Sequence, residues 1–174
     1  MLIHSYHKGL DWVDEMNIGI KQELGDDYRL SIQYMDTKRL PVEKFQAAAD
    51  RTFDQFQREK PDVVIICDDN GFRLLGQRIA ATTPVVFCGI NGEIRRDYPW
   101  VIEARNVTGV LERPLIKRTI AEVIRVTRIT PHNALILLGD SPTARAFHYS
   151  DLGGKDMMRI SRSINADVLR VADL

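Results

Sequence analysis

The run Val63–Cys67 constrains the fold more than any other part of the sequence, because it is continuously apolar and rich in β-branched residues. A strand with one face in water alternates apolar and polar residues, whereas a strand covered on both faces does not. Pro61 precedes the run and the polar triplet Asp68–Asn70 follows it, so its length is that of a strand. The run therefore predicts the central strand of a parallel sheet with helices on both faces.

Strand and helix patterns alternate along the rest of the first 112 residues. Apolar alternation or short β-branched runs predict strands at residues 2–6, 28–35, 84–87 and 107–111. Helical spacing predicts helices at residues 12–24, 41–56 and 70–81, with Asn70 placed to cap the last of them. Such βαβα alternation is typical of an α/β protein with a doubly wound parallel sheet of the flavodoxin-like or Rossmann-like kind.

The remaining residues predict the beginning of a second sheet. Pro114 opens an amphipathic helix, followed by a strand at 134–138, an interrupted helical stretch at 142–164 and a strand-like segment at 168–171. We expect residues 1–112 to form a first lobe and residues 113–174 a crossover and a partial second lobe. Because an isolated βαβ unit leaves strand edges uncovered, we also expect the chain to be part of a longer protein.

Charge and cysteine content exclude several classes of partner. Acidic and basic residues number 24 each, so no net charge draws the chain to nucleic acid or to an anionic membrane. No apolar run approaches the roughly 20 residues that span a bilayer, and no signal-peptide pattern is present, although a mature exported protein has lost its signal. The two cysteines, Cys67 and Cys88, lack metal-ligand spacing and predict buried thiols, with a disulfide as the alternative.

Four polar segments follow predicted strands, at the points where ligands bind in doubly wound sheets. They are Ser5–Lys8, Asp36–Arg39, Asp68–Asn70 and Cys88–Asn91. Because the carboxyl ends of parallel strands meet at one edge of a sheet, we expect these segments to converge there.

Several of these segments together resemble one known family. The motifs are Ser5–His7 with Gly9 and Trp12, then Tyr34–Arg39, then Pro61-Asp62 leading to Asp68–Asn70, and finally Pro84–Asn91. In this order they resemble ABC-transporter substrate-binding proteins of the tryptophan- and tyrosine-binding type, especially relatives that serve as periplasmic sensor domains of membrane-bound signalling proteins. The resemblance covers roughly the first two thirds of the chain.

The resemblance implies the first lobe of a type I periplasmic-binding-protein fold, here with a truncated second lobe, that closes on a small solute by hinge motion. It implies a periplasmic or other extracytoplasmic location, and a membrane signalling module or an ABC permease as partner. No cofactor is expected. No metal is expected either, because His4 and His7 lie on opposite sides of the first predicted strand and cannot form a two-histidine pair. A homodimer is a further expectation. The ligand-binding residues that it implies are Ser5, Tyr6, Trp12, Asp36, Asp68, Asp69 and Asn91. Glu112 and Asp140 are placed near the crossover and in the partial second lobe.

Several of the residues in these loops also have a purely structural interpretation. Asp68 and Asp69 can cap the helix that follows them, and Trp12 can belong to the core. Asn91 can simply accommodate an unusual backbone angle, and Lys38-Arg39 can be solvated surface.

Enzyme functions find little support in the sequence. No GxGxxG or GxxxxGK[ST] motif is present, and Cys88 lacks the small residue that a nucleophile elbow places two positions earlier. A phosphoacceptor receiver domain needs acidic residues after its first strand, where this chain has Ser5–His7. We therefore predict a non-enzymatic sensor domain for a small solute such as an amino acid. The solute-binding component of an importer is the alternative, and a cytoplasmic α/β enzyme ranks third.

Overall fold

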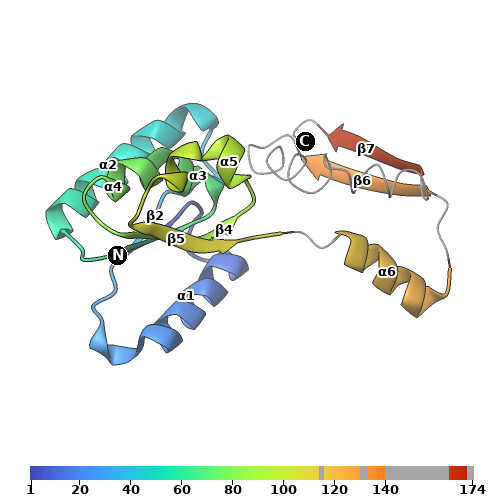
Figure 1. Ribbon diagram of the computed structural model, residues 1–174, viewed down its shortest axis with the longest axis horizontal. Helices are drawn as coiled ribbons and strands as arrows, with labels where there is room; N and C mark the ends of the chain where they lie inside the picture. The colour runs from blue at the N-terminus through green and yellow to red at the C-terminus, as the bar shows by residue number, and fades with distance from the viewer. Residues whose placement is uncertain (114–115, 130–132, 140–164, 172–174) are drawn as a thin grey trace. The chain divides into compact units, whose positions relative to one another are not determined.

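The computed structural model describes residues 1–113, 116–129, 133–139 and 165–171, and the chain divides into two compact units (Figure 1). Unit 1 comprises Met1–Ile90 and Tyr98–Leu111, and unit 2 comprises Asn91–Asp97 and the chain from Glu112 onward. The assignment of residues 1–112 to one lobe and 113–174 to a crossover and second lobe stays a prediction.

Unit 1 is built on a five-stranded, entirely parallel sheet in the order β2-β1-β3-β4-β5. The strands are β1 (Leu2–His4), β2 (Ile32–Tyr34), β3 (Val64–Cys67), β4 (Val85–Ile90) and β5 (Val107–Leu111). The apolar run of the sequence supplies β3, the central strand, in which Val64 and Ile66 are fully buried. The predicted doubly wound α/β fold is confirmed.

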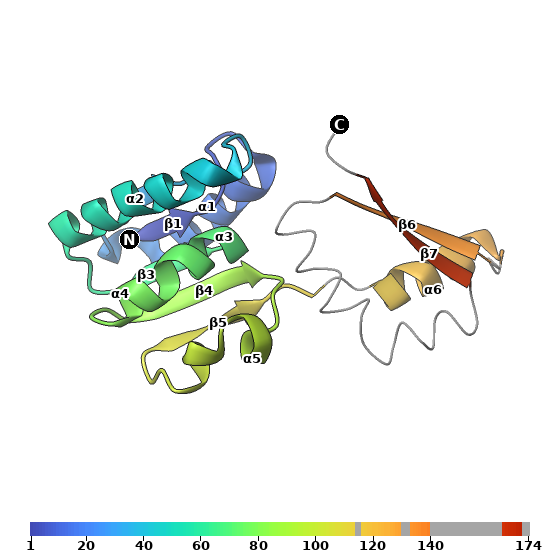
Figure 2. The same ribbon diagram turned by 90° about the horizontal axis from the view of Figure 1, so that it is seen from above.

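Helices cover both faces of this sheet. Helix α1 (Asp11–Leu24) lies on one face, whereas α2 (Phe45–Glu59), α3 (Asp69–Gly71) and α4 (Gln77–Ala80) lie on the other (Figures 1 and 2). A π-helical turn, Phe72–Gly76, joins α3 to α4. Its Phe72 ring is fully buried and packs against Phe87, with 4.9 Å between the ring centroids. This packing fixes the helix that follows β3 against β4.

Two local predictions are wrong. The second strand was expected over residues 28–35, but β2 pairs only with the three-residue β1 and is equally short, while Tyr28 is 66 % exposed. The third helix begins one residue earlier than expected. Its first N–H is capped by the Asp68 carboxylate, which accepts from the Asp69 amide at 2.7 Å, so Asn70 lies inside the helix and is not its cap.

Unit 2 contains α5 (Ile94–Asp97), α6 (Ile116–Thr127) and two strands, β6 (Asn133–Gly139) and β7 (Asn165–Val171), which pair in parallel. These elements confirm the helix predicted after Pro114 and the strands predicted near residues 134 and 168. The expected helical stretch at 142–164 and Asp140 lie outside the described residues. Within the described part of the chain, no helix combines the length and apolar character needed to cross a membrane.

Candidate ligand site at the carboxyl edge of the sheet

Ser5 joins the polar loops that follow β1, β2 and β3. Its side chain is almost completely buried, and its hydroxyl donates to the Cys67 carbonyl at 2.8 Å and accepts the Gly71 amide at 2.7 Å. The Ser5 carbonyl accepts from both the amide and the hydroxyl of Thr37, each at 2.8 Å. The Thr37 hydroxyl in turn accepts a hydrogen bond from the side-chain amide of Asn70 at 3.1 Å. These bonds position the loops, and a direct ligand contact by Ser5 stays a prediction.

The helix after β3 approaches Ser5 closely because residue 71 is glycine. A Cβ atom at Gly71 would lie 3.0 Å from the Ser5 hydroxyl oxygen and 3.2 Å from a methyl group of Ile66. Both contacts are with buried groups that have little room to move. Glycine at this position therefore lets the start of the helix reach the Ser5 hydroxyl.

Three residues with positive φ mark the carboxyl ends of β2, β3 and β4. Asp36 follows β2 with φ 60°, and Asp68 follows β3 with φ 74° and ψ 158°. Gly89 lies near the end of β4 with φ 67°, where the register between β4 and β5 shifts. For an aspartate, the Asp68 conformation costs about 1–3 kcal/mol, and such strain concentrates at ligand sites. The strain at Asp68 is held by surrounding structure, because its amide donates to the Cys88 carbonyl at 2.8 Å.

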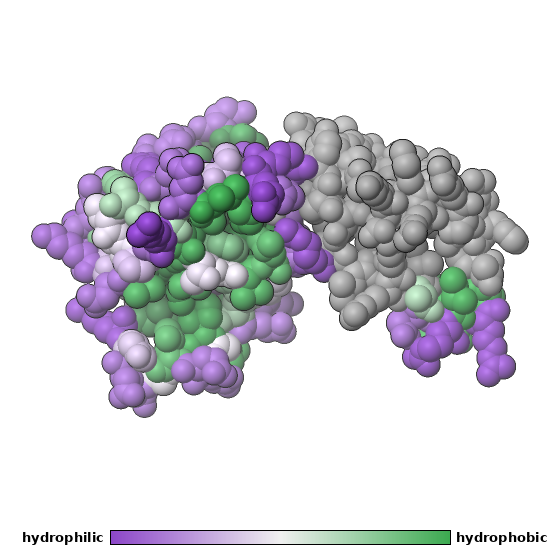
Figure 3. Space-filling view, viewed as in Figure 1, coloured by the Kyte–Doolittle hydropathy of each residue, from purple (hydrophilic) through white to green (hydrophobic). Residues whose placement is uncertain are grey.

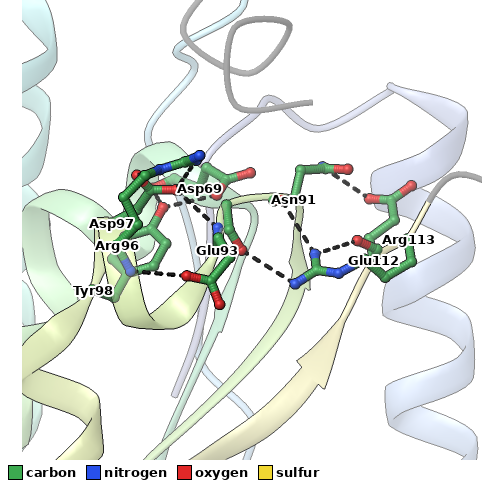
Figure 4. A network of polar contacts seen from close by, with 9 residues as sticks. Asp69, Asn91, Glu93, Arg96, Asp97, Tyr98, Glu112 and Arg113 are labelled. Carbon is green, nitrogen blue, oxygen red and sulfur yellow. Dashed lines mark hydrogen bonds and ion pairs between the residues drawn. The ribbon is translucent and has the colours of Figure 1, made fainter. Parts of the chain in front are cut away.

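Asp68 and Asp69 are buried carboxylates, only 3 % and 6 % exposed. The capping interpretation is confirmed for Asp68, whose carboxylate accepts from the Asp69 amide. The Asp69 carboxylate instead accepts a hydrogen bond of 2.8 Å from the hydroxyl of Tyr98 (Figure 4). Tyr98 is itself buried and comes from the chain between β4 and β5, where sequence analysis placed no site residue near it. Carboxylate oxygens are hydrogen-bond acceptors, so both side chains are chemically suited to a ligand N–H.

Two aromatic side chains stand beside the end of β1. The Tyr6 and Trp12 rings meet edge to face, 5.9 Å apart, and the Lys38 ammonium lies 4.5 Å from the Tyr6 ring centroid. A Cβ at Gly89 would come within 2.9 Å of the Trp12 ring, so this glycine makes room for it. Trp12 is half-buried, a position compatible with either of its predicted roles.

Asp36 is engaged by two basic side chains. The Arg39 guanidinium donates two hydrogen bonds to its carboxylate, at 2.7 and 2.9 Å, and His7 Nδ1 lies 3.5 Å from the same carboxylate. The hydrogen bond from Arg39 holds the pKa of Asp36 below its ordinary value. Lys38 and Arg39 are both exposed, as expected for surface residues, although each has a specific partner.

Behind the sheet edge, His4 is fully buried under α1. Its Nε2 lies 2.8 Å from the side-chain oxygen of Asn17, and its ring stacks on Tyr34 at 5.6 Å. The Asn17 amide also donates to the Tyr34 hydroxyl at 3.2 Å. Burial lowers the pKa of His4, which favours the neutral imidazole.

Asn91 belongs to unit 2, whereas the other six predicted ligand-binding residues belong to unit 1. Asn91 is buried and donates to the Glu112 carboxylate at 3.3 Å, while Arg113 donates to the Asn91 carbonyl at 3.1 Å (Figure 4). Sequence reasoning placed Glu112 near the crossover but missed Arg113. Among the residues that the structure describes, no group of three or more His, Cys, Asp or Glu side chains is arranged to hold a metal ion.

The solved structures that resemble this chain include two with the following descriptions. The ABC domain from Streptococcus pneumonia in complex with L-Trp matches with a TM-score of 0.65 and 14 % identity, over 98 % of this chain and 56 % of that one. The ligand-free, open structure of CD0873 from Clostridium difficile, a substrate binding protein with adhesive properties, matches with a TM-score of 0.56 and 10 % identity, over 99 % of this chain and 57 % of that one.

The chain thus spans little more than half the length of these two structures. No family model and no curated protein matches the sequence. At such low identity the likeness concerns the fold. The predicted fold class is confirmed: the chain has a doubly wound, parallel α/β sheet and is similar in fold to these two structures.

Proposed function

We propose that this chain is the ligand-recognition region of an extracytoplasmic solute-binding protein and that it binds its ligand at the carboxyl ends of β1, β3 and β4. The observation that carries the proposal is the placement of two buried carboxylates, Asp68 and Asp69, at this edge. The backbone is strained at Asp68 and held by several hydrogen bonds. Buried charges and strained backbone are costly and are retained mainly where they serve binding or catalysis.

The chemistry of this edge favours a small ligand that carries an ammonium group. Carboxylates accept charge-assisted hydrogen bonds from ammonium groups, which are about twice as strong as those between neutral partners. The Tyr6–Trp12 pair offers an aromatic surface to the apolar part of the same ligand. An amino acid combines both features, and the complex of the similar Streptococcus domain with L-Trp supports this ligand class.

The proposed roles differ among the predicted site residues. Asp68, Asp69, Tyr6 and Trp12 contact the ligand, while Ser5 fixes the loops from which they project. Asp36 holds Arg39 and His7 at the rim of the same edge. That Asn91 also binds the ligand stays a prediction.

In the whole protein we propose that a second lobe completes the site and closes over the ligand by a hinge. Closure is then read by an attached membrane signalling module, as in a sensor, or by an ABC permease. The resemblance of Tyr34–Arg39 to sensor relatives favours the sensor, and a homodimer is compatible with either. A membrane-spanning segment elsewhere in the full-length protein would decide for the sensor.

The proposal is tested with a thermal-shift screen of this chain and of a version extended through a second lobe. The ligands are the amino acids, small carboxylates, nucleotides and NAD. We expect an amino acid to raise the melting temperature of the extended version, because a ligand that binds only the folded state stabilises it. Stabilisation of the short chain by a nucleotide or NAD would instead favour an α/β enzyme over a solute-binding protein.

A substitution then locates the site. In the extended protein, replacing both Asp68 and Asp69 by Ala should weaken binding of the ligand found in the screen by more than about tenfold. Asp50→Ala is the matched control, since Asp50 is an exposed aspartate of α2 that pairs with Arg78. Equal affinity in all three proteins would remove the two carboxylates from the site.

A further inference from the structure

Cys67 and Cys88 stand side by side on neighbouring strands. They occupy the same register position of the β3–β4 ladder, and their sulfur atoms lie 3.0 Å apart. Both are free thiols, of which Cys67 is fully buried and Cys88 half-buried. Sequence analysis predicted two buried thiols, with a disulfide as the alternative. The structure has two free thiols in direct contact, of which only Cys67 is fully buried.

We infer that Cys67 and Cys88 form a redox-modification site, at which a small disulfide oxidises the two thiols to an intramolecular disulfide between β3 and β4. Neighbouring strands hold paired Cα atoms about 4.8 Å apart, within the roughly 4.4–6.8 Å that a disulfide spans. Because the strands already hold the two sulfur atoms in contact, closing the bond needs only a small side-chain adjustment.

Cys88 is the thiol that reacts first. The hydrogen bond from Cys67 lowers the pKa of the Cys88 thiol, whereas the same bond and burial raise the pKa of Cys67. The thiolate is the nucleophile in exchange, so the lower-pKa sulfur attacks. The Cys88 thiolate attacks one sulfur of the small disulfide RSSR and releases one RS⁻. The Cys67 thiol then loses its proton and attacks the Cys88 sulfur, releasing the second RS⁻, so the protein loses two electrons and RSSR becomes two thiols.

Access to Cys88 comes from the sheet face that carries Val86 and Val110. Alternation along β4 places Val86 on the same face as Cys88, and pairing of Val86 with Thr108 places Val110 there as well. Coverage of this face decreases toward the sheet edge, since Val86 is half-buried and Val110 is 70 % exposed. Figure 3 shows apolar side chains gathered at the surface over β5 and α1. A small disulfide can therefore approach the Cys88 sulfur from this side.

The crosslink would lie directly beneath the candidate ligand site. Cys67 immediately precedes Asp68 and Cys88 immediately precedes Gly89, the two positive-φ residues at the ends of β3 and β4. A bond between the cysteines would tie these two strand ends together. An effect of the crosslink on ligand binding would rest on the proposed function. The oxidation itself does not, because it can be measured without a ligand.

The test is incubation of the fully reduced protein with oxidised glutathione, followed by acid quenching, alkylation under denaturing conditions and intact-mass measurement. We expect a monomer lighter than the reduced protein by two hydrogen atoms, with no thiol left to alkylate. The disulfide form should also melt roughly 5–10 °C above the reduced form, because the bond restricts the unfolded chain. Three results would each overturn the inference: two thiols that stay reduced while the denatured protein reacts, a persistent glutathione adduct, or a disulfide-linked dimer.

Single variants assign the order of attack. Cys67→Ser should accumulate a glutathione adduct on Cys88, because no second thiol remains to displace it. Cys88→Ser should react at least tenfold more slowly, because Cys67 is fully buried. An equal rate in the two variants would contradict the assignment of Cys88 as the attacking thiol, and the wild-type mass measurement does not depend on either variant.

Discussion

The Tyr98 hydroxyl donates a 2.8 Å hydrogen bond to the Asp69 carboxylate, and both side chains are buried. The two residues come from segments 29 positions apart in the sequence. The phenol of Tyr98 is thus one of the groups that hold the Asp69 carboxylate in place at the end of β3.

Tyr98→Phe removes this donor and leaves the ring in place. Losing a hydrogen bond to a buried charged group should lower the free energy of unfolding by about 1–3 kcal/mol. Urea denaturation of wild type and variant measures the loss. Tyr28→Phe is the control, since Tyr28 is 66 % exposed, and it should change stability by less than about 0.5 kcal/mol. Equal free energies of unfolding for the Tyr98 variant and the wild type would show that this hydrogen bond does not stabilise the protein.

The positive φ of Asp68 predicts an unusual order of stability among its variants. Asp68→Gly and Asp68→Ala both lose the helix cap, but only glycine adopts φ 74°, ψ 158° without strain. The glycine variant should therefore be more stable than the alanine variant by about 1 kcal/mol or more, the reverse of the usual order in regular structure. Thermal and urea unfolding of the two proteins give the comparison, and an alanine variant as stable as the glycine variant would show that the strain is absent in solution.

Gly89 and Gly19 form a matched pair for alanine substitution. Gly89→Ala combines a positive φ with a Cβ that would meet the Trp12 ring at 2.9 Å, so we expect a loss of about 1–3 kcal/mol and a displaced ring. Gly19 lies in α1 with open space around it, and Gly19→Ala should stabilise by up to about 1 kcal/mol. Tryptophan fluorescence together with denaturation distinguishes the two, and an unperturbed Gly89→Ala protein would remove the argument for close packing there.

Because His4 is buried, we expect the protein to lose stability in mild acid. Its folded-state pKa is depressed by burial, so below its ordinary value of about 6.5 the unfolded chain binds a proton that the folded protein resists. The free energy of unfolding should therefore fall as the pH drops from about 6.5 to 5. Above this pH range, His4 should contribute no pH dependence to the free energy of unfolding. His4→Gln should flatten this part of the stability curve, measured by urea denaturation at each pH. A curve with the same slope in both proteins would assign the acid sensitivity to other groups.

The parallel sheet and its central strand could be predicted because they depend on patterns that are local in the sequence. The apolar run at β3 and the βα alternation around it require a buried parallel strand whatever the details of its neighbours. The length of β2 could not be predicted, because a strand extends only as far as its partner, and its partner β1 has three residues.

The candidate site could likewise be predicted only in part. Polar residues after strands indicated which edge to inspect, and Asp68, Asp69 and Tyr6 do follow β3 and β1. The partners of these residues were missed because they are distant in sequence: Tyr98 for Asp69, and Lys38 for Tyr6. The capping error at Asn70 has a different cause, since Asp68 and Asn70 are both good caps and only the backbone angles at Asp68 separate them.

The hydroxyl of Ser5 also makes the loops around it energetically interdependent. The Ser5 hydroxyl is hydrogen-bonded to Cys67 and Gly71, and the Ser5 backbone carbonyl is hydrogen-bonded to Thr37. A substitution in one loop therefore changes the bonds available to the others. Residues that share a partner depart from additivity by about 0.5–3 kcal/mol in double-mutant cycles, and Ser5→Ala combined with Thr37→Val should show such coupling. Substitutions in these three loops should therefore affect stability as a set and not independently.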